Sequence, residues 1–157
     1  MKKLVPALLV LAAAAYFLPG RFQRLSAGDR APAFWAAPPG QVVLGWTFRG
    51  TDLLRCESEA DELRRVQARW GGRIRVVAVA VGVDGTIAAS FFRSERLRGD
   101  LRVLDEREYR RRFGDAPLPR LYLVREGRVV DVIDPPKAPA TVEASWLGTR
   151  VHRSLLD

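Results

Sequence analysis

The chain has 157 residues, of which 48% are hydrophobic and 28% are charged, a balance typical of one folded globular domain. It holds one cysteine, Cys56, and one histidine, His152, so it can form neither an internal disulfide, nor a Cys-x-x-Cys dithiol, nor the usual zinc sites. A serine–histidine–aspartate enzyme would have to use His152, which lies five residues from the C-terminus. The sequence therefore indicates no metal site and no cofactor.

The charge is strongly positive, with 26 Lys and Arg against 18 Asp and Glu and a formal net charge of +8. The arginines are interleaved with acidic residues, as in residues 61–65 and 105–108, a pattern typical of solvated helix faces. The one tight basic cluster, residues 110–112, has no aromatic platform around it. We therefore expect no nucleic-acid partner.

The N-terminus has the layout of an export signal. Lys2 and Lys3 precede an apolar stretch, residues 4–18, which holds Ala13 and Ala15 in a possible cleavage motif. As a helix this stretch would span about 22 Å, short of a bilayer core of about 30 Å. Residues 1–19 thus form either a cleaved signal peptide or a signal anchor that associates with the membrane through residues 4–18. A buried N-terminal helix of a cytosolic protein is the alternative. Either signal predicts an extracytoplasmic location, in the periplasm or cell envelope, secreted across or anchored in the inner membrane.

The first half of the remaining chain predicts a linker and three elements. Residues 20–40 are rich in Gly, Pro and Ala and indicate a linker and lead-in segment. Residues 41–48 form a candidate strand, and Thr51 and Asp52 are capping residue types before a helix that continues to Trp70. Gly71 and Gly72 are expected to end that helix, and residues 75–81 form an apolar strand of the kind buried on both faces.

The second half predicts three helices and three strands. A helix over residues 85–96, a strand over 101–104 and a helix over 106–113 come first. Strands over 121–125 and 128–133 follow, joined at Glu126-Gly127 by a tight hairpin, and a helix over 141–156 ends the chain. This order predicts an α/β domain over residues 41–157, with three layers: a central mixed sheet and helices on both faces.

Several motifs, in this order, resemble the thioredoxin superfamily, in particular its TlpA-like and alkyl hydroperoxide reductase/thiol-specific antioxidant (redoxin) branch. The stretch GDRAPAF at residues 28–34 is similar to the Gly-Asp-x-Ala-Pro-x-Phe motif of that branch, and residues 43–48 look like its first core strand. Residues 56–59 resemble the Cys-x-x-Glu that opens its first helix. Residues 104–114 resemble the stretch before the conserved proline, Pro119 resembles the cis-proline, and residues 125–130 resemble the closing hairpin. The resemblance implies a thioredoxin-like fold over residues 27–156 and a cis Leu118–Pro119 bond beside the first helix.

The redox motif departs from the family pattern of Trp-Cys-x-x-Cys. If Cys56 is the second cysteine, Leu53 occupies the place of the first cysteine and Asp52 that of the tryptophan. In thiol–disulfide exchange the first cysteine attacks and the second resolves the mixed disulfide. The chain therefore keeps only the resolving position of a degenerate motif.

Cys56 has two interpretations from the sequence. A helix N-terminus, with Arg49 and Arg55 nearby, favours a reactive thiolate. Cys56 also lies on one helical stripe with apolar residues, which favours a buried, unreactive thiol of raised pKa. That stripe consists of Cys56, Ala60, Leu63, Val66 and Trp70.

Two functions follow. In the first, the protein is an exported thiol-dependent oxidoreductase that acts through Cys56 alone on a thiol substrate, and an external thiol releases the mixed disulfide. In the second, it is a catalytically inactive module that binds an envelope protein at the surface that holds substrate peptides in the family. The binding residues are then Leu53, Leu54, Pro119 and Arg120. A one-cysteine peroxidase is a third alternative, with Arg120 as its arginine, but Leu53 stands where that pattern needs Thr or Ser.

Overall fold

The computed structural model describes residues 23–136 and 145–156, and a five-stranded sheet in the order β3-β2-β1-β4-β5 forms its centre. β1 pairs in parallel with β2, as β2 does with β3, whereas the β1–β4 and β4–β5 pairs are antiparallel. The predicted mixed sheet is confirmed. The strands are β1 (Val42–Arg49), β2 (Ile74–Val81), β3 (Asp100–Leu104), β4 (Arg120–Arg125) and β5 (Arg128–Ile133).

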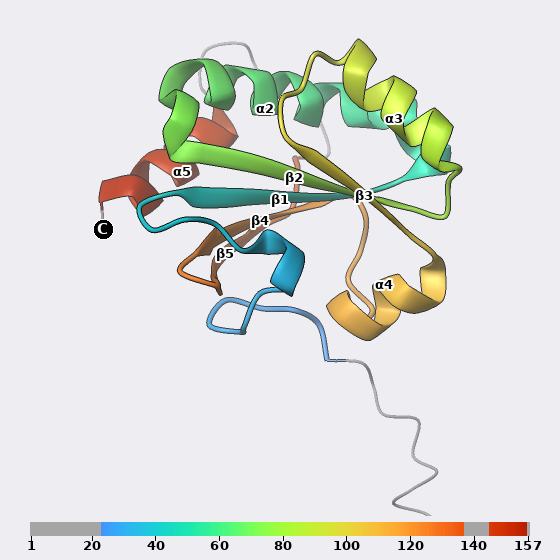
Figure 1. Ribbon diagram of the computed structural model, residues 1–157, viewed down its shortest axis with the longest axis horizontal. Helices are drawn as coiled ribbons and strands as arrows, with labels where there is room; N and C mark the ends of the chain where they lie inside the picture. The colour runs from blue at the N-terminus through green and yellow to red at the C-terminus, as the bar shows by residue number, and fades with distance from the viewer. Residues whose placement is uncertain (1–22, 137–144, 157) are drawn as a thin grey trace, which may run out of the picture.

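Helices cover both faces of this sheet, so the predicted three-layer α/β fold is also confirmed. Figure 1 shows α2 (Glu57–Trp70) and α3 (Gly85–Ser94) above the sheet and α4 (Glu106–Phe113) below it. α5 (Trp146–Leu156) packs beside α2, and its Leu147 and Val151 belong to the same apolar cluster as the buried face of α2. The short 3-10 helix η1 (Ala33–Trp35) lies on the face of α4 and supplies Trp35 to its core.

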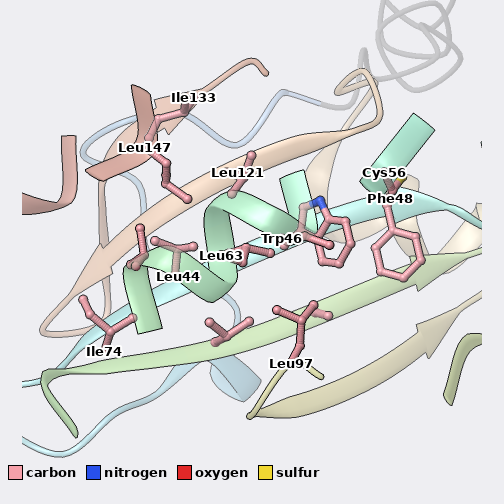
Figure 2. Packing of buried hydrophobic residues seen from close by; sticks show 14 of the residues in the cluster. Leu44, Trp46, Phe48, Cys56, Leu63, Ile74, Leu97, Leu121, Ile133 and Leu147 are labelled. Carbon is pink, nitrogen blue, oxygen red and sulfur yellow. The ribbon is translucent and has the colours of Figure 1, made fainter. Parts of the chain in front are cut away.

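Two apolar clusters fill the spaces on either side of the sheet, and strand alternation assigns residues to them. The α2-side core takes Leu44, Trp46 and Phe48 from β1 (Figure 2), whereas the α4-side core takes Val43 from the same strand. Both faces of β2 are covered, because no side chain from residue 76 to residue 81 is exposed to solvent. This explains the continuous apolar sequence of that strand.

Within the predicted linker and lead-in segment, residues 20–40, the part from Leu25 to Trp35 packs against the domain rather than standing apart from it. Leu25 and Trp35 are buried in the α4-side core, and the Trp35 ring lies directly over Gly45 of β1. A Cβ atom at Gly45 would lie 2.4 Å from Trp35 Cζ2, so this strand position must be glycine. The backbone of Gly28 donates to Val129 O at 2.8 Å, which places the segment along β5. The Gly/Pro-rich composition hid these contacts from sequence analysis.

The first helix begins differently from the prediction. Residues Gly50–Cys56 form a 3-10 segment, η2, and the α-helix proper starts at Glu57. Asp52 has non-helical angles (φ −113°, ψ 26°) inside η2 and does not cap it. Thr51 is exposed and likewise gives no side-chain cap. The helix ends, as predicted, at Gly71, whose φ of +49° favours glycine.

The other predicted elements are confirmed with small shifts of their ends. α3 stops at Ser94 and begins after Asp84, whose carboxylate accepts from Thr86 N at 2.8 Å. The β4–β5 hairpin turns at Glu126 and Gly127, both with positive φ. α5 begins after Ser145, whose Oγ accepts from Gly148 N at 2.8 Å. The predicted helical residues 141–144 and the predicted signal, residues 1–19, lie outside the described residues. Within residues 23–136 and 145–156, no helix is long and apolar enough to cross a bilayer.

Candidate functional site

The candidate site lies where β1 ends and two other segments meet it. η2 follows β1 directly and carries Leu53 and Cys56, while β4 starts beside β1 with Thr47 opposite Arg120. Thr47 Oγ1 donates to Arg120 O at 3.1 Å and ties the two strands together there. The Leu118–Pro119 peptide bond just before β4 is cis, as the resemblance implied. Pro119, which precedes β4, and η2, which follows β1, therefore lie at the same end of the sheet's strands.

Cys56 is the last residue of η2 and is fully buried. None of its surface reaches solvent, and it belongs to the α2-side core, where Figure 2 shows it beside Phe48. Ala60, Leu63 and Val66 on α2 are in the same core, so the predicted helical stripe is confirmed. The sulfur therefore packs as a small apolar group.

The electrostatic surroundings keep this thiol protonated. Burial, with smaller contributions from the charges of Glu59 and Asp52, raises the pKa of Cys56 from 9.0 to about 12. Arg49, whose positive charge was expected to stabilise a thiolate, instead forms an ion pair with Glu106, with Nη1 and Oε1 3.1 Å apart. The Arg55 side chain lies outside the described residues. At neutral pH the group is a thiol, which is a poor nucleophile.

Glu59 lies one helical turn after Cys56 and is an addition to the predicted site. Its side chain is buried, and Oε2 has no hydrogen-bond partner within the part of the chain that the structure describes. Burial raises the pKa of this carboxyl, while hydrogen bonds from its own backbone N–H and from Ser58 oppose the rise. The sequence signal was its place beside the apolar stripe, three residues after Cys56.

The Arg120 side chain lies on the face of the sheet opposite that of Cys56. In β4, Leu121 faces the α2-side core and Tyr122 the α4-side core, so alternation puts Arg120 on the face of Tyr122. Its Nε pairs with Asp134 Oδ1 at 2.7 Å, and only 11% of its side chain is exposed. This position also removes the arginine that a peroxidase site would need.

The remaining predicted residues are placed as follows. Leu53 is half-buried against the α2-side core, and Pro119 is half-buried at the start of β4, whereas the Leu54 side chain lies outside the described residues. His152 is exposed on α5, with its ring 6.4 Å from that of Trp70. In the described ranges, no three His, Cys, Asp or Glu side chains are grouped as metal ligands would be. Asp52, Leu53, Cys56 and Glu59 thus lie within η2 and the first turn of α2, at the end of the sheet where Pro119 precedes β4.

Comparison with known proteins shows similarity in fold. No family model matches the sequence, and no curated protein is significantly similar to it. Among solved structures, a secreted disulfide oxidoreductase of Mycobacterium tuberculosis homologous to Escherichia coli DsbE matches with a TM-score of 0.59 and 19% identity, over 73% of this chain and 83% of that one. A putative thiol:disulfide interchange protein DsbE of Chlorobium tepidum matches with a TM-score of 0.62 and 18% identity, over 85% and 99%. The thioredoxin domain of a Bacteroides vulgatus thiol-disulfide oxidoreductase matches with a TM-score of 0.63 and 14% identity, over 83% and 99%.

These similarities support the thioredoxin-like fold of the chain. Because their sequence identities are all below 20%, these structures support a shared fold but say nothing about a shared reaction. The chain has the fold of thioredoxin-like thiol:disulfide oxidoreductases, with a single cysteine where a dithiol motif would place its second.

Proposed function

We propose that this is an exported thioredoxin-fold protein that binds a partner polypeptide of the cell envelope at the Leu53–Pro119 surface, without thiol–disulfide exchange by Cys56. One observation carries the proposal: the site has no nucleophile at its surface. Leu53 holds the outer position, and the one thiol is fully buried with a pKa of about 12. The resemblance implies that the surface around Leu53 and Pro119 holds extended peptides, and the Leu53 side chain adds apolar contact to it.

A photoreactive amino acid at position 53 tests this binding in cells that produce the full chain. We expect discrete crosslinked species from position 53 and none of the same mass from position 87, an exposed position on α3. The crosslinks should persist in Cys56→Ser, because the thiol takes no part. Crosslinks that are absent, that appear equally from position 87, or that are lost in Cys56→Ser would contradict the proposal.

A second function, thiol exchange through Cys56 alone, is favoured by one observation: Oε2 of the buried Glu59 side chain has no hydrogen-bond partner within the described residues and can accept the thiol proton. The Cys56 sulfur would attack a substrate disulfide, forming a mixed disulfide and releasing one substrate thiolate, which takes up a proton. An external thiol would then attack the mixed disulfide and restore the Cys56 thiol. The non-helical angles at Asp52 inside η2 mark the place where local opening would expose the sulfur.

A disulfide reduction assay separates the two functions. With insulin and excess glutathione, we expect the wild-type protein and Cys56→Ser to show the same background rate. A rate that depends on Cys56 would establish the exchange reaction instead. Leu53→Cys is the matched positive control, since it restores the dithiol spacing at the same site.

Export is part of the proposal and rests on the charged and apolar pattern of residues 1–19, which the described residues do not include. It is supported by the secreted Mycobacterium tuberculosis protein among the structural neighbours. Alkaline phosphatase fused to the C-terminus of the full chain should be active, because that reporter needs an oxidising compartment. An inactive fusion at normal protein levels would contradict export, and N-terminal sequencing would distinguish cleavage from an anchor.

A further inference from the structure

A basic groove lies at the end of the sheet opposite Cys56, between the β4–β5 hairpin and α5. Its volume is about 630 Å³, and its lining includes Arg125 and Arg128 from the hairpin and Arg150 and Arg153 from α5. Arg125 pairs in register with Val42, the first residue of β1, whereas Cys56 follows the last residues of that strand. The groove is therefore separate from the site proposed above.

The groove carries excess positive charge. Against the four arginines stand two carboxylates in the lining, those of Glu126 and Asp131, which leaves a net charge of about +2. Asp131 Oδ2 pairs with Arg150 Nη1 at 3.0 Å. Within the described residues, Arg125, Arg128 and Arg153 form no ion pair. Three guanidinium groups thus meet in one concave surface without a bound counter-charge.

Two of these guanidinium groups are held in place by backbone carbonyls. Arg125 Nη1 donates to Ser154 O at 3.1 Å, and Arg128 Nη1 donates to Gly28 O at 3.0 Å. Each bond uses one of the five N–H donors of a guanidinium and leaves the others available. Because the side chains are already fixed, a ligand would lose less free energy in ordering them. This arrangement is that of a preformed anion site.

We propose that this groove binds a phosphomonoester, carried either by a soluble small molecule or by a lipid headgroup such as that of phosphatidic acid. A phosphomonoester has a charge of about −1.5 to −2 near neutral pH and three acceptor oxygens, which match the excess charge and the several planar donors. A carboxylate offers one charge and two oxygens and fits only one guanidinium fork. Val130, 43% exposed beside the arginines, gives the organic part of the ligand an apolar contact.

The test uses the full chain in non-ionic detergent, titrated with phenyl phosphate and with benzoate, which share a ring and differ in the anion. We expect phenyl phosphate to bind at least about tenfold more tightly, as the added charge-assisted hydrogen bonds require. The amide NMR signals of Val130, Asp131 and Ser154 should shift on binding. Equal affinity for both anions, or shifts confined to other residues, would overturn the proposal.

Variants locate the site. Arg128→Gln and Arg153→Gln should each weaken phenyl phosphate binding by about fivefold or more, since each removes a charged donor. Arg102→Gln, which changes an exposed arginine on β3 at the other edge of the sheet, should leave it unchanged. Unaltered thermal unfolding of each variant shows that the groove itself is preserved. Equal losses in all three variants would indicate attraction to the overall charge and would overturn the assignment.

A third ligand, soluble dihexanoyl phosphatidic acid, whose phosphate is a monoester, decides the source of the phosphate. If it shifts the same amide signals and loses affinity in Arg153→Gln, the groove accepts a lipid headgroup. If phenyl phosphate alone does so, the groove is specific for a soluble phosphate ligand. Binding of neither through Arg153 would refute the site.

Discussion

Near the carboxyl end of β1, Cys56 and Glu59 on the α2 side of the sheet differ from Arg120 on the α4 side in how burial affects their charge. On the α2 side, Cys56 and Glu59 are buried without an opposite charge, and burial raises the pKa of both, which favours their neutral forms. On the α4 side, burial lowers the pKa of Arg120, but the hydrogen bond and charge of Asp134 outweigh it and hold the pKa above its usual value. A partner, rather than depth alone, decides which group keeps its charge.

This difference bears directly on function. Where a dithiol motif would place its second cysteine, the chain has an uncharged thiol in an apolar core, whereas the nearly buried charge of Arg120 lies on the other face. Chemistry by Cys56 would need a rearrangement of η2, whereas binding at the surface needs none. The predictions below alter one face at a time.

The largest expected effect comes from the tryptophans at the centre of each face. Trp46→Ala on the α2 side and Trp35→Ala on the α4 side should each lower the free energy of unfolding by about 3–5 kcal/mol. Chemical denaturation would measure this, with Ile87→Ala, at a half-exposed position, as a control of small effect. A small loss for Trp35→Ala alone would mean that the N-terminal segment is not part of the cooperative unit.

Replacement of the thiol should have the next largest effect. Cys56→Ser puts a hydroxyl in an apolar site, and without a hydrogen-bond partner this should cost about 1–3 kcal/mol of stability. Cys56→Ala is the matched control, because it removes the sulfur without adding a polar group. If Cys56→Ser were as stable as the wild type, the sulfur would be solvated and its assignment to the α2-side core would be wrong.

Glu59 should make stability depend on pH. Since its folded pKa is raised, the folded state keeps a proton that the unfolded state has already released. The contribution of Glu59 to stability should therefore be greatest below the ordinary value of 4.5 and fall as pH rises through the raised pKa. Glu59→Gln should remove this dependence and be more stable near neutral pH by about 1 kcal/mol. A pH profile of urea midpoints checks it, and an unchanged slope in the variant would argue against a buried carboxyl.

The smallest expected effect concerns the α4 side. Asp134 is 67% exposed, so Asp134→Asn should destabilise the protein by only about 0.2–1 kcal/mol. The difference should shrink in 1 M NaCl, because salt screens an exposed pair. A loss of several kcal/mol that is insensitive to salt would show that Arg120 depends on Asp134 far more than the exposure indicates.

The sequence predicted the elements well where local signals and packing agree. Three patterns each favour a single local structure, and the structure contains all three. They are the apolar stripe from Cys56 to Trp70, the apolar β2 strand and the Glu126-Gly127 turn. The start of the first helix was wrong because Thr51 and Asp52 suit a cap, whereas the chain leaves β1 through a tight 3-10 turn. The packing of Trp35 on Gly45 was not predicted, because a tertiary contact gives no periodic signal.

The candidate site was predicted less completely than the fold. Cys56 and Leu53 were identified because a known motif fixes their spacing, and Pro119 because of its place before a strand. The face on which Arg120 lies was not predicted, since a one-residue difference along a strand reverses the side that a side chain faces. Glu59 was missed as a site residue because an acidic residue early in a helix is usually solvent-exposed and favoured by the helix dipole.

The reactivity of Cys56 in the folded protein tests the central claim most directly. We would measure the rate of alkylation by iodoacetamide against pH, for the native full chain and for the chain in denaturant. A pKa of about 12, against 9.0 for an ordinary cysteine, predicts about 10³-fold less thiolate at pH 8 in the native state. The native rate should be lower by at least that factor and rise only on unfolding or at strongly alkaline pH. Rapid native alkylation with a midpoint near or below pH 8 would contradict the account and would make Cys56 the working thiol of an oxidoreductase.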